Sequence, residues 1–221
     1  MFITDYLDHS FPKEVSYFIA FLLVFIACIF DFFDGFVARL TNSSSKIGIQ
    51  LDSFSDLISF SIAPSFLMFD VMQNSERFMS SNLEEGSLIP YFSFLLIPFA
   101  MYRLARFNSG ISMINFQGLP TPAVGLFFMS LPFLPIDLTH TIIVMLIIIF
   151  SFLMVSSIEF YSVKISLKDN TRFLLILLIL YVIVFVGLMV IKENLLSFFS
   201  ISIIIYVALN LVLKIFARNK F

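Results

Sequence analysis

Seven apolar stretches, each close to the length that crosses a bilayer, occupy almost the whole chain. They cover about residues 15–38, 47–71, 88–107, 120–136, 141–160, 172–191 and 196–214. A membrane-spanning helix needs roughly 20 apolar residues, and barrel strands would show an alternating polar and apolar pattern that these stretches lack. Lipid offers no partner to unpaired backbone groups, so the stretches are expected to be helices. The sequence therefore predicts an all-α integral membrane protein, a bundle of about seven transmembrane helices.

Composition argues for a single membrane domain over residues 1–221. Hydrophobic residues make up 60% of the chain and charged residues 13%, whereas soluble domains have roughly 45–50% and 25%. A net charge of −2 provides no basic surface of the kind that nucleic-acid binding needs. The one cysteine, Cys28, excludes a disulfide within the chain and a metal site built from several thiolates.

The basic residues predict the orientation in the membrane, because cytoplasmic loops are enriched in Lys and Arg. With the N-terminus outside, ten basic residues fall at inner ends and loops, and three fall outside. The C-terminus is therefore expected to face the cytoplasm. Residues 1–14 include four charged side chains, and at about 1.5 Å per residue they are too short to span a bilayer. Residues 1–14 are therefore expected to lie outside the bilayer.

Four aspartates carry the strongest functional signal, because ionisable groups within membrane helices are costly and mark functional sites. Asp31 and Asp34 are spaced i, i+3 near the inner end of the first stretch, and Asp52 and Asp56 are spaced i, i+4 near the start of the second. Each spacing puts both side chains on one helix face. Counted from the loop that joins the stretches, the two pairs reach a similar depth. The four carboxylates are therefore expected to converge.

Converging carboxylates need a counter-charge, since like charges at short range cannot all ionise at ordinary pH. All-oxygen ligands favour Mg²⁺, Mn²⁺ or Ca²⁺. The histidines, His9 and His140, fall at the outer side, so zinc is not expected, and His140 is expected to be solvated in a short outer loop. A hard cation suggests a phosphate substrate, because Mg²⁺ commonly shares its coordination between carboxylates and phosphate oxygens.

The aspartates belong to a longer pattern of eight fixed residues over 26 positions, Asp31-x2-Asp34-Gly35-x2-Ala38-Arg39-x8-Gly48-x3-Asp52-x3-Asp56. This catalytic motif, residues 31–56, resembles at every defined position the signature of the CDP-alcohol phosphatidyltransferase family. Within that family the chain is most similar to the bacterial-type phosphatidylserine synthases. The segments that carry this likeness are Phe30–Gly35, Leu40–Ser45, Gln50–Ser53, Ile58–Pro64, Tyr102–Asn108 and Gly118–Pro122.

Two positions separate members of the family. Relatives that use glycerol phosphate usually have a proline directly after the third aspartate, where this chain has Ser53. Ser61 stands where the serine-using members often have glycine, and this change is expected to alter packing more than chemistry. The likeness covers about residues 20–135. Members with this motif usually have one more apolar helix before the one that carries the first aspartate pair, so the resemblance implies an in-frame apolar stretch upstream of Met1.

The resemblance implies the fold of the family and the transfer of a phosphatidyl group from CDP-diacylglycerol to L-serine, giving phosphatidylserine and CMP. It also implies a homodimer in the cytoplasmic membrane, among phospholipids, with the active site facing the cytoplasm. Two divalent cations, Mg²⁺ or Mn²⁺, would be held by four carboxylates, those of Asp31, Asp34, Asp52 and Asp56. Asp56 would also be the general base. CDP-lipid binding would fall to Asp31, Gly35, Ala38, Arg39 and Gly48.

Residues 102–122 form the expected substrate-specificity region. Its candidates for binding serine or phosphate are Arg103, Arg106, Asn108 and Thr121. A basic cluster at the inner face also follows from the orientation rule, so serine, lipid phosphate and anionic headgroups all stay open as ligands. Gly118 and the two prolines that follow it are expected to break the chain and begin the fourth helix.

Two other functions are compatible with intramembrane aspartates. The first is the same transfer to another alcohol, such as inositol phosphate, glycerol phosphate or choline. The second is an ion-coupled transporter, in which intramembrane carboxylates bind ions. A transporter predicts inverted repeats, which the sequence does not show, and leaves the spacing of Gly35, Ala38, Arg39 and Gly48 unexplained.

Overall fold

The computed structural model describes residues 12–41, 45–74, 87–109, 117–158 and 196–218. Every element within these ranges is a helix, which confirms the all-α prediction. Two of the described helices are long and apolar enough to cross a membrane, Lys13–Val37 and Ile47–Asn74. The shorter apolar helices are Thr121–Phe133, His140–Val155 and Ser197–Leu211.

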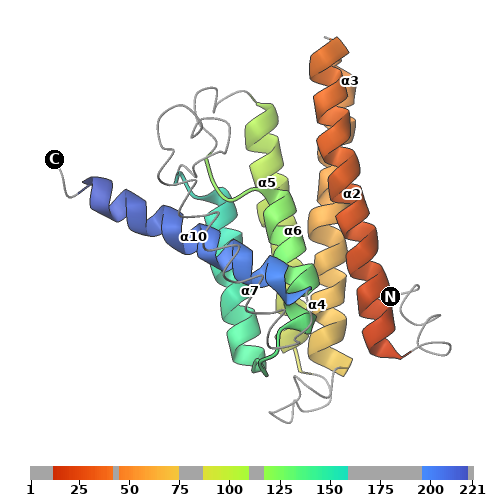
Figure 1. Cartoon of the computed structure of the whole chain (residues 1–221), viewed down its shortest axis with the longest axis vertical. Coiled ribbons are helices and arrows are strands. Elements are labelled where there is room, and N and C mark those ends of the chain that lie inside the picture. The colour runs from red at the N-terminus through yellow and green to blue at the C-terminus, as the bar shows by residue number, and fades with distance from the viewer. Residues whose placement is uncertain (1–11, 42–44, 75–86, 110–116, 159–195, 219–221) are drawn as a thin grey trace.

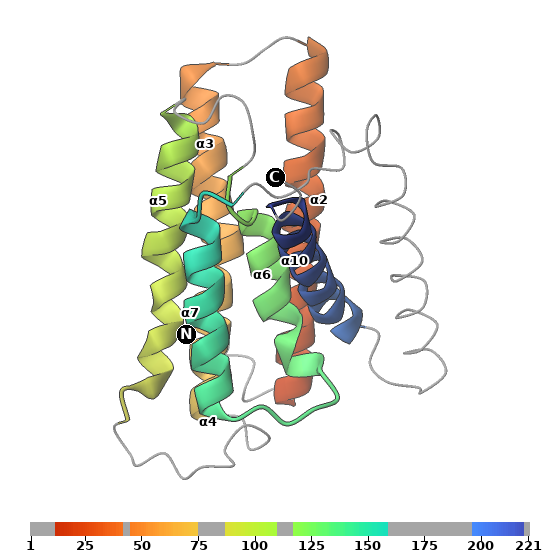
Figure 2. The same cartoon turned by 90° about the vertical axis from the view of Figure 1, so that its left-hand side faces the viewer.

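Two long arms carry the aspartates. Helix α2, Lys13–Thr41, runs along the long axis of the molecule. The chain then returns through α3, Lys46–Leu57, a π-helical turn η1, Ile58–Ile62, and α4, Ala63–Asn74 (Figures 1 and 2). Ser45 begins α3, because its side chain accepts a hydrogen bond from the Gly48 N–H at 2.9 Å and so satisfies one of the free donors of the first turn.

The remaining helices complete the bundle around α6. A 3₁₀ helix η3, Ile89–Leu95, leads into α5, Leu96–Asn108. Helix α6, Thr121–Ser130, ends in a 3₁₀ turn η4, Leu131–Phe133, and is followed by α7, His140–Val155. Helix α10, Ser197–Arg218, crosses α6 obliquely (Figure 1). Six of the seven predicted stretches thus coincide with described helices, while 172–191 lies outside the described residues. The number of membrane spans stays a prediction.

Aromatic side chains of α6 lie at the centre of the core. Phe127 and Phe128 are fully buried, and the ring of Phe127 stacks on that of Phe150 from α7 with centroids 4.2 Å apart. Gly125 lets α6 approach η1 closely, since a Cβ added there would lie 2.8 Å from the Cα of Phe60. The turn that joins α3 to α4 is therefore held directly against the central helix.

A sharp turn at Gly118 brings the start of α6 to the end of α7. Gly118 has φ +79°, in the left-handed region that favours glycine. Its N–H donates to the Ile158 carbonyl at 2.9 Å, and the Leu119 N–H donates to the Leu153 carbonyl at 3.0 Å. Pro120 then precedes the first residue of α6. The prediction that this segment begins the fourth helix is confirmed.

The opposite end of the bundle holds a polar network that joins α2, α4 and α7. The Tyr17 hydroxyl donates to Asp70 at 2.9 Å, and the Asn74 side chain donates to the same carboxylate at 2.8 Å. The expectation that His140 is solvated in a loop is wrong, because His140 is the first residue of α7 and is buried. Its Nε2 lies 2.9 Å from the Met72 carbonyl, one of the last carbonyls of α4, which have no partner within that helix.

Candidate active site

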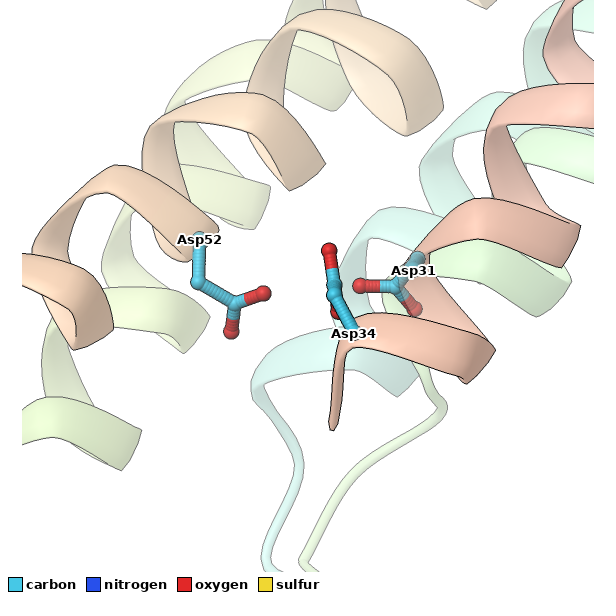
Figure 3. Close-up of side chains that lie close together, drawn as sticks. All are labelled: Asp31, Asp34 and Asp52. Carbon is cyan, nitrogen blue, oxygen red and sulfur yellow. The ribbon is translucent and has the colours of Figure 1, made fainter. Parts of the chain in front are cut away.

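Three aspartates from two helices converge on one point. Asp31 and Asp34 project from α2 and Asp52 from α3, and their side chains point toward one another across the space between the helices (Figure 3). Each offers a carboxylate oxygen, and these atoms all lie within 4.8 Å of one another. Asp31 is half-buried, whereas Asp34 and Asp52 are exposed. The i, i+3 spacing on α2 places the first two on one face, as the sequence predicts.

Asp56 lies one helical turn after Asp52 on α3. Its carboxyl group lies close to that of Asp31. It is half-buried, more enclosed than Asp52. The fourth predicted carboxylate is therefore beside the other three, but it is not one of the three whose oxygens lie within 4.8 Å of one another.

Arg103 lies near Asp56, on the neighbouring helix α5. The two charges interact, and one terminal nitrogen of the guanidinium, Nη1, donates to the Thr121 hydroxyl at 2.7 Å. The Nε of Arg103 is buried and has no hydrogen-bond partner among the described residues. A cation held at one end by a hydroxyl, with a further donor free, is suited to an anionic group of a ligand.

Arg106 has a different environment from Arg103. Its guanidinium donates to the Val155 carbonyl at 2.8 Å, to Gln117 at 3.2 Å and to Ser156 at 3.5 Å. These carbonyls belong to the end of α7 and to the segment before Gly118, where a cation stabilises the unpaired carbonyl end of a helix. Arg106 thus joins the ends of α5 and α7 to the start of α6.

Asn108, the last residue of α5, contacts α3 directly. Its Nδ2 donates to Ser53 Oγ at 2.9 Å, and Ser53 Oγ lies 3.3 Å from Asn108 Oδ1. Ser53 directly follows Asp52 in the chain. The sequence marked both residues separately, but no sequence signal shows that they pair, because they are 55 positions apart.

The residues expected to bind the CDP-lipid lie on both sides of the carboxylates. Gly35 is half-buried on α2, and Gly48 is exposed in the first turn of α3. Ala38 and Arg39 fall in the last turns of α2, but their side chains lie outside what the structure describes. The sequence missed Asp70 as an intramembrane carboxylate; its signal was an acidic residue within the stretch 47–71.

The donor set fits a hard divalent cation. Mg²⁺ and Mn²⁺ accept three carboxylate oxygens that lie close together as ligands. Among the described residues, this group of possible ligands consists of aspartates alone. Such ions commonly complete their coordination with water and phosphate oxygens, which two exposed carboxylates leave room for. The arrangement is therefore of the kind that binds a phosphate group through a divalent cation.

Comparison with known proteins agrees with this chemistry. The family model described as CDP-alcohol phosphatidyltransferase matches residues 1–217. A CDP-diacylglycerol–serine O-phosphatidyltransferase of Helicobacter pylori is 30% identical over 219 residues, covering 95% of this chain and 88% of that protein. The enzyme of that name from Bacillus subtilis is 33% identical over 154 residues, covering 68% of this chain and 79% of that protein.

A third relative of the same name, from Methanocaldococcus jannaschii, is 36% identical over 141 residues, covering 64% of this chain and 63% of that protein. The matched region of the family model includes all four aspartates and the Arg103–Thr121 pair. The chain belongs to the CDP-alcohol phosphatidyltransferase family.

Proposed function

We propose that this membrane protein transfers a phosphatidyl group from CDP-diacylglycerol to L-serine, giving phosphatidylserine and CMP. The observation that carries the proposal is the convergence of Asp31, Asp34 and Asp52 within 4.8 Å, beside a cation, Arg103, that is bonded to Thr121. Carboxylates suit a metal-bound pyrophosphate, and the cation suits the carboxylate of an amino-acid acceptor. The names of the relatives, which include an archaetidylserine synthase of Methanothermobacter thermautotrophicus, point to the same acceptor.

Asp31, Asp34 and Asp52, together with Asp56, would hold the divalent cations, with Mg²⁺ and Mn²⁺ as the candidates and two ions expected per site. When bound, such ions supply positive charge that stabilises the pyrophosphate and the leaving CMP. Two helices bring three of these carboxylates together, Asp31 and Asp34 from α2 and Asp52 from α3 (Figure 3). Neither helix needs to move for the cluster to form.

Asp56 is the candidate general base. It would take the proton from the serine hydroxyl as the hydroxyl oxygen forms a bond to the lipid-side phosphorus. The bond from that phosphorus to the CMP oxygen breaks in the same displacement, and CMP leaves with the electron pair. Of the two aspartates on α3, Asp56 is the more enclosed, and its charge interacts with that of Arg103.

Binding of the two substrates would be divided between the helices. Gly35, Ala38, Arg39 and Gly48, on α2 and α3, are the candidates for the CDP-lipid. Arg103 with Thr121 is the candidate for the serine carboxylate, and its buried Nε is a free donor for it. Arg106 is supported as a structural residue instead, because carbonyl groups occupy its guanidinium.

The location follows from the same residues. The ends of α5 and α7 and the start of α6 lie at the end of the bundle that carries the aspartates. The basic residues of this end support a cytoplasmic orientation, because Lys and Arg are enriched on that side. We expect the active site to open to the cytoplasm, in a cytoplasmic membrane. A homodimer, implied by the family resemblance, stays a prediction.

An acceptor panel tests the proposal. Purified protein in detergent with CDP-diacylglycerol and Mg²⁺ or Mn²⁺ would be supplied in turn with L-serine, glycerol 3-phosphate, inositol phosphate and choline. CMP release and the mass of the lipid product are measured. We expect phosphatidylserine from L-serine and little product from the others. Another alcohol that reacts about tenfold faster than serine would overturn the assignment, since the gap would exceed about 1.4 kcal/mol of transition-state preference.

A further inference from the structure

Helices α3 and α5 meet along a seam with two polar contacts. The helices run in opposite directions and pack together (Figure 2). Ser53 bonds Asn108. The charges of Asp56 and Arg103 interact about one turn further along the two helices, since Asp56 lies three residues after Ser53 and Arg103 lies five before Asn108. Both contacts fit the same antiparallel alignment of α3 and α5. The uncharged pair thus lies next to the charged one.

The Ser53–Asn108 pair has properties that fit a positioning role. Both side chains are partly buried, and each offers the other a donor and an acceptor. In a membrane protein such a contact between helices is selective, because a polar side chain has few other partners in lipid. It joins the residue directly after Asp52 to the last residue of α5. A slip of one helix along the other would break it.

The alignment of α5 against α3 affects binding of the acceptor more than binding of the CDP-lipid. All four aspartates lie on α2 and α3, so the metal-dependent hold on the pyrophosphate does not depend on α5. Arg103 does lie on α5. A serine whose carboxylate meets Arg103 has its hydroxyl only three bonds from the carboxyl carbon. The spacing of Arg103 from Asp56 therefore decides whether that hydroxyl reaches the base.

We infer that the Ser53–Asn108 pair is a positioning element that fixes α5 against α3 and thereby sets the affinity for the amino-acid acceptor. The inference rests on the proposed function, because it takes serine as the acceptor. Ser53 and Asn108 act through Arg103 and Asp56 rather than on the reacting atoms. This role explains why α3 and α5 are joined by a hydrogen bond that neither cation binding nor proton transfer requires.

The test is a double-mutant cycle of Ser53→Ala and Asn108→Ala, assayed by CMP release. The KM for serine is measured at saturating CDP-diacylglycerol, and the KM for CDP-diacylglycerol at saturating serine. A membrane hydrogen bond of typical strength predicts that each single variant raises the KM for serine by about threefold to twentyfold. The double variant should be no worse than the poorer single one, because both remove the same contact. The KM for the CDP-lipid should change by less than about twofold.

Two further variants make the result specific. Ser53→Thr keeps the hydroxyl and should retain a KM for serine near that of the wild type. Ser55→Ala, the matched control, removes an exposed hydroxyl two positions away on the same helix, for which the structure gives no partner. The KM for the CDP-lipid also reports whether each variant is folded.

Additive effects in the double variant would overturn the inference, and so would equal rises in both KM values. These results differ from a failure of the proposed function. If the wild type makes no phosphatidylserine, the proposed function is wrong. If the wild type uses serine and the paired variants behave as the control does, only the positioning role is wrong.

Discussion

Replacing Gly118 with alanine should weaken the joint between α5, α6 and α7. The Cβ of an alanine in the present backbone would lie 2.1 Å from the Met154 carbonyl oxygen, so the backbone must shift. A left-handed conformation costs a residue other than glycine about 1–2 kcal/mol. The shift would also strain the hydrogen bonds from Gly118 to Ile158 and from Leu119 to Leu153, each worth about 1 kcal/mol. We expect Gly118→Ala to lose about 3–4 kcal/mol of unfolding free energy.

The assay is thermal unfolding of the purified protein in detergent. For a chain of this size the loss corresponds to a fall in Tm of about 6–16 °C. Gly48→Ala is the matched control for stability, since its Cβ would meet only the Ser45 side-chain oxygen, at 3.1 Å. It should cost less than about 1 kcal/mol, the value of the cap that it crowds. A Tm for Gly118→Ala within about 2 °C of the wild type would refute the reasoning.

Three further predictions concern the site. Asparagine in place of Asp31, Asp34 or Asp52 should abolish CMP release, because each change removes an anionic ligand. Metal binding is read separately, as the rise in Tm on titration with Mg²⁺ or Mn²⁺, and this titration should shift to higher concentrations; an unchanged titration would contradict the ligand role. Asp56→Asn should lower kcat by about 10²–10⁴ while the CDP-lipid still binds, and near-normal turnover would rule out the base. Arg106→Ala should lower the Tm by about 3–12 °C, because hydrogen bonds to a charged group contribute about 1.5–3 kcal/mol; a large rise in the KM for serine at unchanged Tm would instead favour direct binding.

The long helices and the convergence of the aspartates could be predicted from the sequence. Apolar length alone predicted α2 and the return arm from Lys46 to Asn74, because no other structure satisfies the backbone in lipid. The i, i+3 and i, i+4 spacings then fixed which side chains share a face. These are local properties, and a single chain segment determines them.

The missing parts depend on contacts between segments distant in the chain. Arg103 and Arg106 look alike in the sequence, but only Arg106 meets the carbonyls at the end of α7, which the turn at Gly118 brings to it. His140 was predicted to be solvated because its partner, the Met72 carbonyl, is 68 positions away. Nothing in the letters Ile58–Ile62 distinguishes a π turn from an α turn.

The π turn η1 sets the directions in which α3 and α4, on either side of it, present their side chains. Successive residues of an α-helix are rotated by about 100° around its axis. If Lys46–Asn74 were one unbroken α-helix, the buried side chains of α4 would point about 120° away from Asp52 and Asp56 around that axis. The wide turn takes up one extra residue, about 100°, and so closes most of this angular offset. Met68 and Met72 can then stay packed in the core while Asp52 points toward the aspartates of α2 (Figure 3). Deleting one residue from η1 would leave each half helical but would rotate the carboxylates out of phase with their partners.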